Sequence, residues 1–153
     1  MIYNYNAEKT ISNGMKTKSD VIINEFSQID TSARSKLFKS QTMVFFGCEL
    51  LNLEESYINK LMTAWRVCST RILNIHRQTH CDLLTPLIQC KNPLLIIEER
   101  IINFFRKMLN HENQLIKYIT SFTLSNNFSY MTVNLMNILY KHSISYEKHP
   151  NQL

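Results

Sequence analysis

The sequence predicts an all-α protein, with about six helices packed as one irregular helical bundle. Only two glycines and three prolines occur in 153 residues, so few turns are enforced and long helices are favoured. Hydrophobic residues make up 44% of the chain, which is enough for a sizeable core. Apolar residues recur at helical spacing, and no segment sustains the alternation of a strand. We therefore expect one helical domain over residues 15–142, between a flexible leader, 1–14, and a frayed tail, 143–153.

The first two helices are predicted from caps and apolar spacing. The leader closes on Asn13-Gly14, a turn signal. The apolar residues of a first helix after Lys18 are Val21, Ile22, Phe26 and Ile29. Asp30-Thr31-Ser32 then offers caps for a second helix that continues to Gly47. Its inward residues are expected to be Ala33, Leu37, Phe38, Val44 and Phe45.

The clearest helix follows Asn52. Glu54 and Glu55 fall in its first turn, where the helix dipole favours anions. Its single apolar stripe consists of Ile58, Leu61, Met62, Trp65, Cys68, Ile72 and Ile75.

Four further segments complete the pattern. Pro86 indicates a short helix around 83–90, and Asn92-Pro93 is typical of an N-cap followed by proline at the first helical position. The long helix that starts there carries Arg106 and Lys107 near its end. The inward residues of the last two helices are expected to be Leu115, Ile116, Ile119, Phe122, Met131, Leu135, Ile138 and Leu139.

Charge and cysteine content indicate the cellular setting. The chain has 17 Lys and Arg against 12 Asp and Glu, a net charge of +5 that favours polyanions such as nucleic acid. It has no apolar run of membrane-spanning length and no signal peptide, so we expect no membrane partner and a cytoplasmic or nuclear location. None of the four cysteines forms a CxxC pair, and we expect reduced thiols, with Cys48 and Cys68 in the core.

Three stretches, in this order, resemble the region downstream of the catalytic palm in reverse transcriptases of non-LTR (LINE-type) retrotransposons. They are KLFKSQTMVFFGCEL at 36–50, INKLMTAWRVCSTRILNIHRQTH at 58–80 and EERIINFFRKMLNHEN at 98–113. The similarity spans roughly residues 20–122. The chain departs from the family at His76, where proline is usual, and at Phe46, where tyrosine is usual.

The resemblance implies a thumb-like helical domain, which in an intact enzyme helps to grip template and primer. The chemistry of that enzyme needs two metal ions on palm aspartates, including an adjacent pair. This chain contains only Asp20, Asp30 and Asp82, none of them adjacent. We therefore expect no catalytic residue, cofactor or metal, and a fragment or remnant that binds nucleic acid weakly at most.

Four basic residues are the candidate contacts for an RNA or RNA–DNA duplex. Lys60 and Arg71 are eleven residues apart, which places them about 20° from each other on one helix face. Arg66 and Arg77 repeat that spacing if the helix continues. Phosphate contacts need several cations, so an ordinary solvated face is the interpretation that we favour for these side chains.

Two other groups of residues have a structural and a functional interpretation. His76, His80 and Cys81 lie close together, and two histidines four residues apart on a helix can bind zinc. No third and fourth ligand stand at a recognised spacing from this pair, unless Cys90 folds back. Thr79-His80 matches the close of the family motif, which favours a helix-terminating role. Trp65 could stack on a base, but its place in the apolar stripe favours core packing.

Two alternatives to the polymerase fragment stay open. One is a small helical interaction module that captures a partner helix in an apolar groove. A large exposed apolar groove would favour that module, whereas a clustered basic face would favour the fragment. The other is a transposon remnant that retains no selected function.

Overall fold

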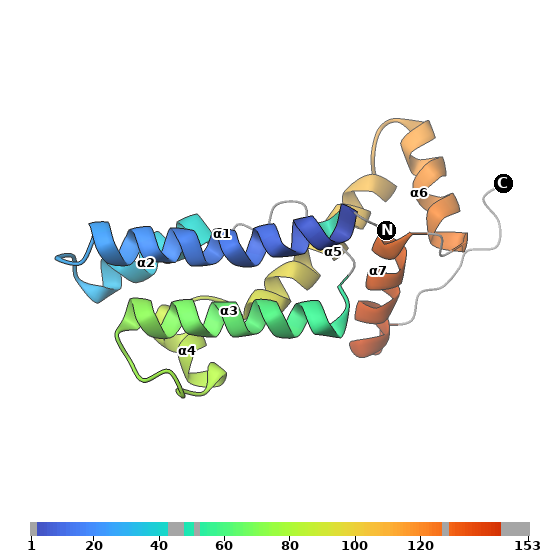
Figure 1. The fold of residues 1–153 in the computed structure, drawn as a ribbon. Helices are drawn as coiled ribbons and strands as arrows, with labels where there is room; N and C mark the ends of the chain where they lie inside the picture. The colour runs from blue at the N-terminus through green and yellow to red at the C-terminus, as the bar shows by residue number, and fades with distance from the viewer. Residues whose placement is uncertain (1–2, 43–47, 51–52, 127–128, 145–153) are drawn as a thin grey trace. The chain divides into compact units, whose positions relative to one another are not determined.

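Seven α-helices and one short 3₁₀ helix make up the described part of the chain, which contains no strand (Figure 1). The computed structural model describes residues 3–42, 48–50, 53–126 and 129–144. The all-α prediction is confirmed, with seven α-helices in place of about six.

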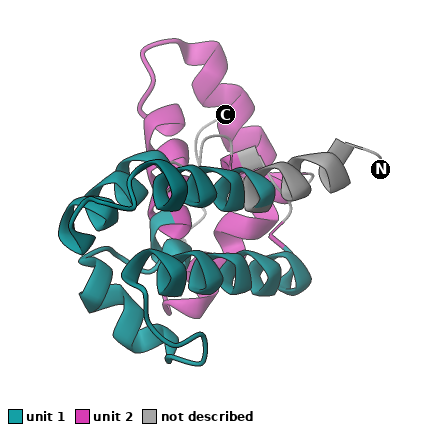
Figure 2. Cartoon of the chain, turned by 60° about the vertical axis from the view of Figure 1, so that its left-hand side comes forward, with its two compact units in different colours: residues 1–46, 54–96 teal, residues 47–53, 97–153 magenta. Residues whose placement is uncertain are grey.

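The chain forms two compact units (Figure 2). Unit 1 comprises Met1–Phe46 and Glu54–Ile96, and unit 2 comprises Gly47–Leu53 and Ile97–Leu153. The helices of unit 1 are α1 (Tyr3–Glu25), α2 (Thr31–Thr42), α3 (Glu55–Leu73) and α4 (Cys81–Ile88). Those of unit 2 are η1 (Cys48–Leu50), α6 (Gln114–Asn126) and α7 (Tyr130–Lys141), together with most of α5 (Pro93–Leu109).

Helix α1 begins at Tyr3, so the expected leader was wrong for residues 3–14. Gly14 lies inside the helix, and a Cβ there would meet nothing within 4 Å, so neither a turn nor a close approach requires this glycine. The helix buries Met15, Ser19 and Ile22, whereas Val21 is exposed. Because the serine of this face is polar, the apolar pattern did not reveal how far the helix extends.

Helix α3 is the centre of unit 1, and it packs against α1, α2 and α4. Helices α1 and α3 lie side by side and run in the same direction (Figure 1). Four predicted stripe residues of α3 are fully buried: Leu61, Trp65, Cys68 and Ile72. From α2, Phe38 joins this core. Burying each large apolar side chain in this way stabilises the fold by about 1.5–3 kcal/mol.

Helix α3 ends at Leu73, four residues before Arg77, which was expected to lie on the same helix. Asn74 adopts a left-handed conformation with φ 53°, and its N–H donates to the carbonyl of Arg71. The next amide, that of Ile75, donates to the Thr70 carbonyl at 3.0 Å, which closes the helix end. Short-chain Asn tolerates this conformation, so the α3 helix stops although the apolar pattern continues.

Caps at both ends set the bounds of the later helices. The Asn92 side chain accepts a hydrogen bond from the Leu94 amide at 2.9 Å and precedes Pro93, as predicted for the start of α5. Ser129 accepts from the Met131 amide at 3.2 Å and starts α7. Ser143 and Ile144 follow α7, and the rest of the expected tail, like residues 43–47 of the expected second helix, lies outside the described residues.

Within unit 2, side chains join η1 and the segment after it to the helices. Glu49 of η1 accepts a hydrogen bond from Arg100 Nε of α5 at 2.9 Å. The amide of Leu53 donates to Asn134 Oδ1 of α7 at 3.3 Å. Cys48, the first residue of η1, is buried as expected, and burial together with the nearby Glu49 carboxylate raises the pKa of its thiol to about 12.

The predicted inward face of α6 was wrong. Leu115, Ile119 and Phe122 are exposed, and the helix instead buries Thr120 and Leu124. The Thr120 hydroxyl donates to the Ile116 carbonyl at 2.7 Å, so this buried polar group is satisfied inside its own helix. The apolar pattern alone therefore selected the wrong side of the helix.

Candidate nucleic-acid interface

The four predicted basic residues do not form one face. Lys60, Arg66 and Arg71 are on α3, but Arg77 lies in the segment between α3 and α4 because the helix ends at Leu73. The predicted repeat of the Lys60–Arg71 spacing by Arg66 and Arg77 is therefore wrong. Arg66 itself is six residues from Lys60, which places it about 120° away around the helix.

Arg71 is committed to an ion pair within unit 1. Its Nη1 lies 2.5 Å from Oδ1 of Asp20 on α1, and both side chains are partly exposed. Partial exposure screens such a pair, so its contribution to stability is small, but the pair neutralises the positive charge locally. Of the four predicted residues, Lys60, Arg66 and Arg77 have exposed side chains and no ion pair with another described residue.

Lys60 faces a groove that a second lysine shares. Lys16 of α1 and Lys60 of α3 line an open groove of about 510 Å³, together with Asn59, Thr63, Ala64 and Val67. Both lysines are exposed, and none of the described residues that line the groove is acidic. Lys16 was not among the predicted contacts, because the first helix was expected to begin at Lys18, whereas α1 begins at Tyr3. The spacing of Met15, Ser19 and Ile22 could have revealed that α1 presents Lys16 beside its buried face.

Trp65 belongs to the core and not to the interface. Its side chain is 0% exposed, which confirms the core packing favoured from the sequence and excludes base stacking in this conformation. Cys68 also lies in the core, as expected from the sequence, and its burial raises the pKa of the thiol.

The histidines near Cys81 act as local caps. His80 is the N-cap of α4, and its Nδ1 accepts a hydrogen bond from the Asp82 amide at 3.4 Å. His80 therefore starts a helix, whereas we had expected it to end one. His76 Nδ1 accepts from the Gln78 amide at 3.2 Å. Among the described residues, no three His, Cys, Asp or Glu side chains are grouped to hold one metal ion.

Each of the three aspartates also has a local role. Asp20 pairs with Arg71, Asp30 accepts a hydrogen bond from the Ser32 amide at 3.0 Å, and Asp82 lies in the first turn of α4. Asp30 and Asp82 lie at helix starts, where a carboxylate satisfies free amides and the helix dipole. None of these contacts brings two carboxylates together.

Among the described residues, α6 carries a row of four exposed large hydrophobic side chains. Leu115, Tyr118, Ile119 and Phe122 are between 52% and 63% exposed and follow one another at helical spacing, and the rings of Tyr118 and Phe122 stack at 6.5 Å. We call these four residues the α6 stripe. Unit 1 also has an apolar cavity of about 280 Å³ between α1 and α2, which is smaller than the lysine groove. Beside this cavity, Lys18 Nζ donates to the Gln41 carbonyl at 2.8 Å.

No helix of the described residues is long and apolar enough to cross a membrane. No family model matches the chain, and no match was found among curated proteins or solved structures.

Proposed function

We propose that the chain corresponds to the helical region that follows the palm in a non-LTR retrotransposon reverse transcriptase, and that it binds nucleic acid weakly and without sequence preference. The three ordered stretches of resemblance motivate the origin. The observation that supports binding is the groove that Lys16 and Lys60 share in unit 1.

The chemistry of the groove suits a phosphate backbone better than a base edge. Two ammonium groups stand on neighbouring helices, and the Asn59 amide is a further donor along the same lining. The Thr63 hydroxyl donates to the Asn59 carbonyl at 2.8 Å and so is less available. Such contacts carry no sequence information, and a few of them give weak, salt-sensitive binding.

The net charge of unit 1 also favours the binding of a polyanion. By sequence, unit 1 holds eleven of the 17 Lys and Arg residues but seven of the 12 Asp and Glu residues. Its net charge is therefore about +4, and that of unit 2 about +1. This excess raises the local concentration of polyanions around unit 1 at low ionic strength.

A salt titration tests binding. We expect affinity for an RNA–DNA hybrid to fall linearly in log salt, and Lys16→Ala with Lys60→Ala to reduce the slope by about 2, roughly one per lost phosphate contact. The matched control removes two charges elsewhere, Arg106→Ala with Lys107→Ala, which are exposed on α5. Equal losses in both double variants would contradict a defined groove. Arg71→Ala should have little effect, because Asp20 already neutralises that side chain.

The proposal includes no polymerase chemistry. Purified protein with a primed RNA template, nucleotides and magnesium should extend nothing above a blank, because its three aspartates are not adjacent and the described residues group no three metal-binding side chains. Template-dependent extension would overturn the assignment of the chain to the region after the palm.

The α6 stripe favours a second candidate function, a helical module that docks on a protein. Monomeric soluble proteins rarely leave contiguous apolar surface exposed without a binding role. The helical spacing of the stripe would suit an apolar helix face laid along α6, rather than a helix held in a groove as the sequence analysis expected.

A further inference from the structure

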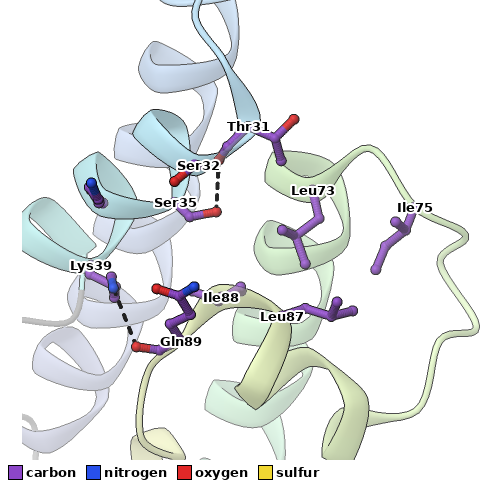
Figure 3. Close-up of a pocket in the computed structure, with 10 residues that line it drawn as sticks. Thr31, Ser32, Ser35, Lys39, Leu73, Ile75, Leu87, Ile88 and Gln89 are labelled. Carbon is purple, nitrogen blue, oxygen red and sulfur yellow. Dashed lines mark hydrogen bonds between the residues drawn. The ribbon is translucent and has the colours of Figure 1, made fainter.

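A third concave site in unit 1 lies where α2 meets the end of α3 and α4 (Figure 3). Its volume is about 320 Å³. Its residues divide into an apolar side, from the end of α3 and from α4, and a polar and cationic side, from α2 and from Gln89, the C-cap of α4. Figure 3 shows the two groups on opposite sides of the space.

The apolar side is formed by Leu73, Ile75 and Leu87. Leu73 and Ile75 are half-buried at the end of α3, where Asn74 turns the chain, and Leu87 is 54% exposed. These side chains are held by helix ends whose conformation is fixed by backbone hydrogen bonds. They offer an aliphatic surface against which a flat or apolar group can lie.

The polar side supplies cations and hydrogen-bonding groups. Lys39 Nζ donates to the Gln89 carbonyl at 3.3 Å, which leaves two of its three N–H groups for a ligand (Figure 3). Lys36 is exposed and has no ion pair with another described residue. Ser35, 6% exposed, donates to the Thr31 carbonyl at 2.9 Å and keeps lone pairs that can accept a hydrogen bond. The side-chain amide of Gln89 adds both a donor and an acceptor.

The volume limits what can enter. A water molecule occupies about 30 Å³ of liquid, so the cavity has room for roughly ten, and a flat ring system of about ten bonded heavy atoms, such as a nucleobase, fits inside it. The start of α2 does not provide an anion site, because the Asp30 carboxylate already accepts from the Ser32 amide. An anionic group would therefore lie at the lysines, outside the apolar part.

We infer that this cavity binds one unpaired nucleotide of a nucleic-acid strand, with its base against Leu73, Ile75 and Leu87 and its flanking phosphates at Lys36 and Lys39. Proteins bind single-stranded nucleic acid by cationic contacts to the backbone together with side chains, usually aromatic ones, that lie against the faces of unpaired bases. In this cavity aliphatic side chains would lie against the base. The inference rests on the proposed function and narrows its ligand to strands with a single-stranded end.

The test compares two RNA–DNA hybrids, one blunt and one with a four-nucleotide single-stranded extension that contains 2-aminopurine. We expect the extended hybrid to bind about fivefold more tightly, the lower end of what one stacked base contributes. Leu87→Ser should remove that preference and leave affinity for the blunt hybrid unchanged. The matched control is Leu83→Ser, an equally exposed leucine on the same helix that does not line the cavity.

A second variant, Lys36→Ala, should also reduce the preference without touching a packed residue. The inference is overturned if the extension adds no affinity, or if Leu87→Ser and Leu83→Ser reduce the preference equally. If the blunt hybrid binds with the expected salt dependence in that case, the proposed function survives alone. If neither hybrid binds the parent chain, both proposals fail.

Discussion

Glu98 is a buried charge whose neighbours explain why it stays ionised. Its side chain is 7% exposed, Lys141 Nζ donates to Oε1 at 2.7 Å, and His142 Nε2 lies 3.0 Å from Oε2. Burial by itself would raise the pKa of Glu98, but hydrogen bonds and charge from Lys141 and His142 together hold this pKa below its ordinary value. The group thus ties the end of α7 to α5 within unit 2.

The low pKa of Glu98 predicts acid sensitivity. A carboxyl with a lowered pKa in the folded state stabilises the fold above its ordinary pKa, and this stability is lost as the pH falls through the folded value. Glu98→Gln should lower the free energy of unfolding by about 1.5–3 kcal/mol at pH 7. It should also flatten the loss of stability between neutral and acid pH. Thermal unfolding measured across that range checks both effects, with exposed Glu112→Gln as the control. Parallel pH profiles for the parent and Glu98→Gln would contradict the pairing.

The helices show which parts of the fold the sequence could predict. The starts of α5 and α7 followed from short polar caps and a proline, and the core face of α3 followed from a long apolar stripe, because these signals act within one or two turns. The true start of α1, the inward face of α6 and the end of α3 did not follow. Those depend on polar buried residues such as Ser19 and Thr120, and on a left-handed Asn74, which an apolar pattern does not record.

For the same reason, the apolar pattern predicted only part of the candidate interface. Lys60 was found because it lies on α3, the helix with the strongest pattern. Lys16 was missed because the buried face of α1 at this point includes the polar Ser19, and Arg77 was misplaced because α3 stops at Leu73. Contacts between helices, such as the pairing of Arg71 with Asp20, need the three-dimensional arrangement and cannot be predicted from spacing within one helix.

Gln89, the C-cap of α4, has a strained backbone conformation whose energetic cost can be measured. Gln89 has φ 57°, a left-handed conformation that costs a residue with a Cβ roughly 1 kcal/mol more than glycine. Gln89→Gly should therefore raise the free energy of unfolding by about 0.5–1 kcal/mol in a denaturant titration. Gln78→Gly, in an exposed loop position without positive φ, is the matched control and should not stabilise. Destabilisation by Gln89→Gly would show that the Gln89 side chain contributes more than the backbone strain costs.

The α6 stripe predicts a measurable apolar surface. Leu115→Ser with Ile119→Ser removes half of its four residues, and the fluorescence of bound anilinonaphthalene sulfonate should fall roughly by half. Helical content should be unchanged, because both side chains are more than half exposed. Tyr140→Ser, a single 89% exposed aromatic on α7, should leave the dye signal as it is. A dye signal that survives the double change would remove the support for the docking function.

At the scale of the whole chain, the basic and the apolar surfaces belong to different units. The lysine groove and the cavity beside α2 are both in unit 1, whereas the α6 stripe is in unit 2. The excess positive charge follows the groove, since unit 2 is nearly balanced. Nucleic-acid binding and protein docking would therefore use different side chains, so a substitution in the α6 stripe removes no residue of the groove.

This separation predicts a lysine footprint. With a blunt RNA–DNA hybrid at low salt, the acetylation of Lys16 and Lys60 should slow several-fold, because phosphates cover both ammonium groups. Lys107 is equally open to reagent on α5, and its rate should stay the same. Adding salt should restore the rates of Lys16 and Lys60 together, since each phosphate contact releases counterions when it forms. Mass spectrometry of the intact, folded chain after brief labelling gives the rate at each site. Uniform protection of all exposed lysines would mean that the hybrid is held by net charge alone, and the groove would then be an ordinary solvated surface.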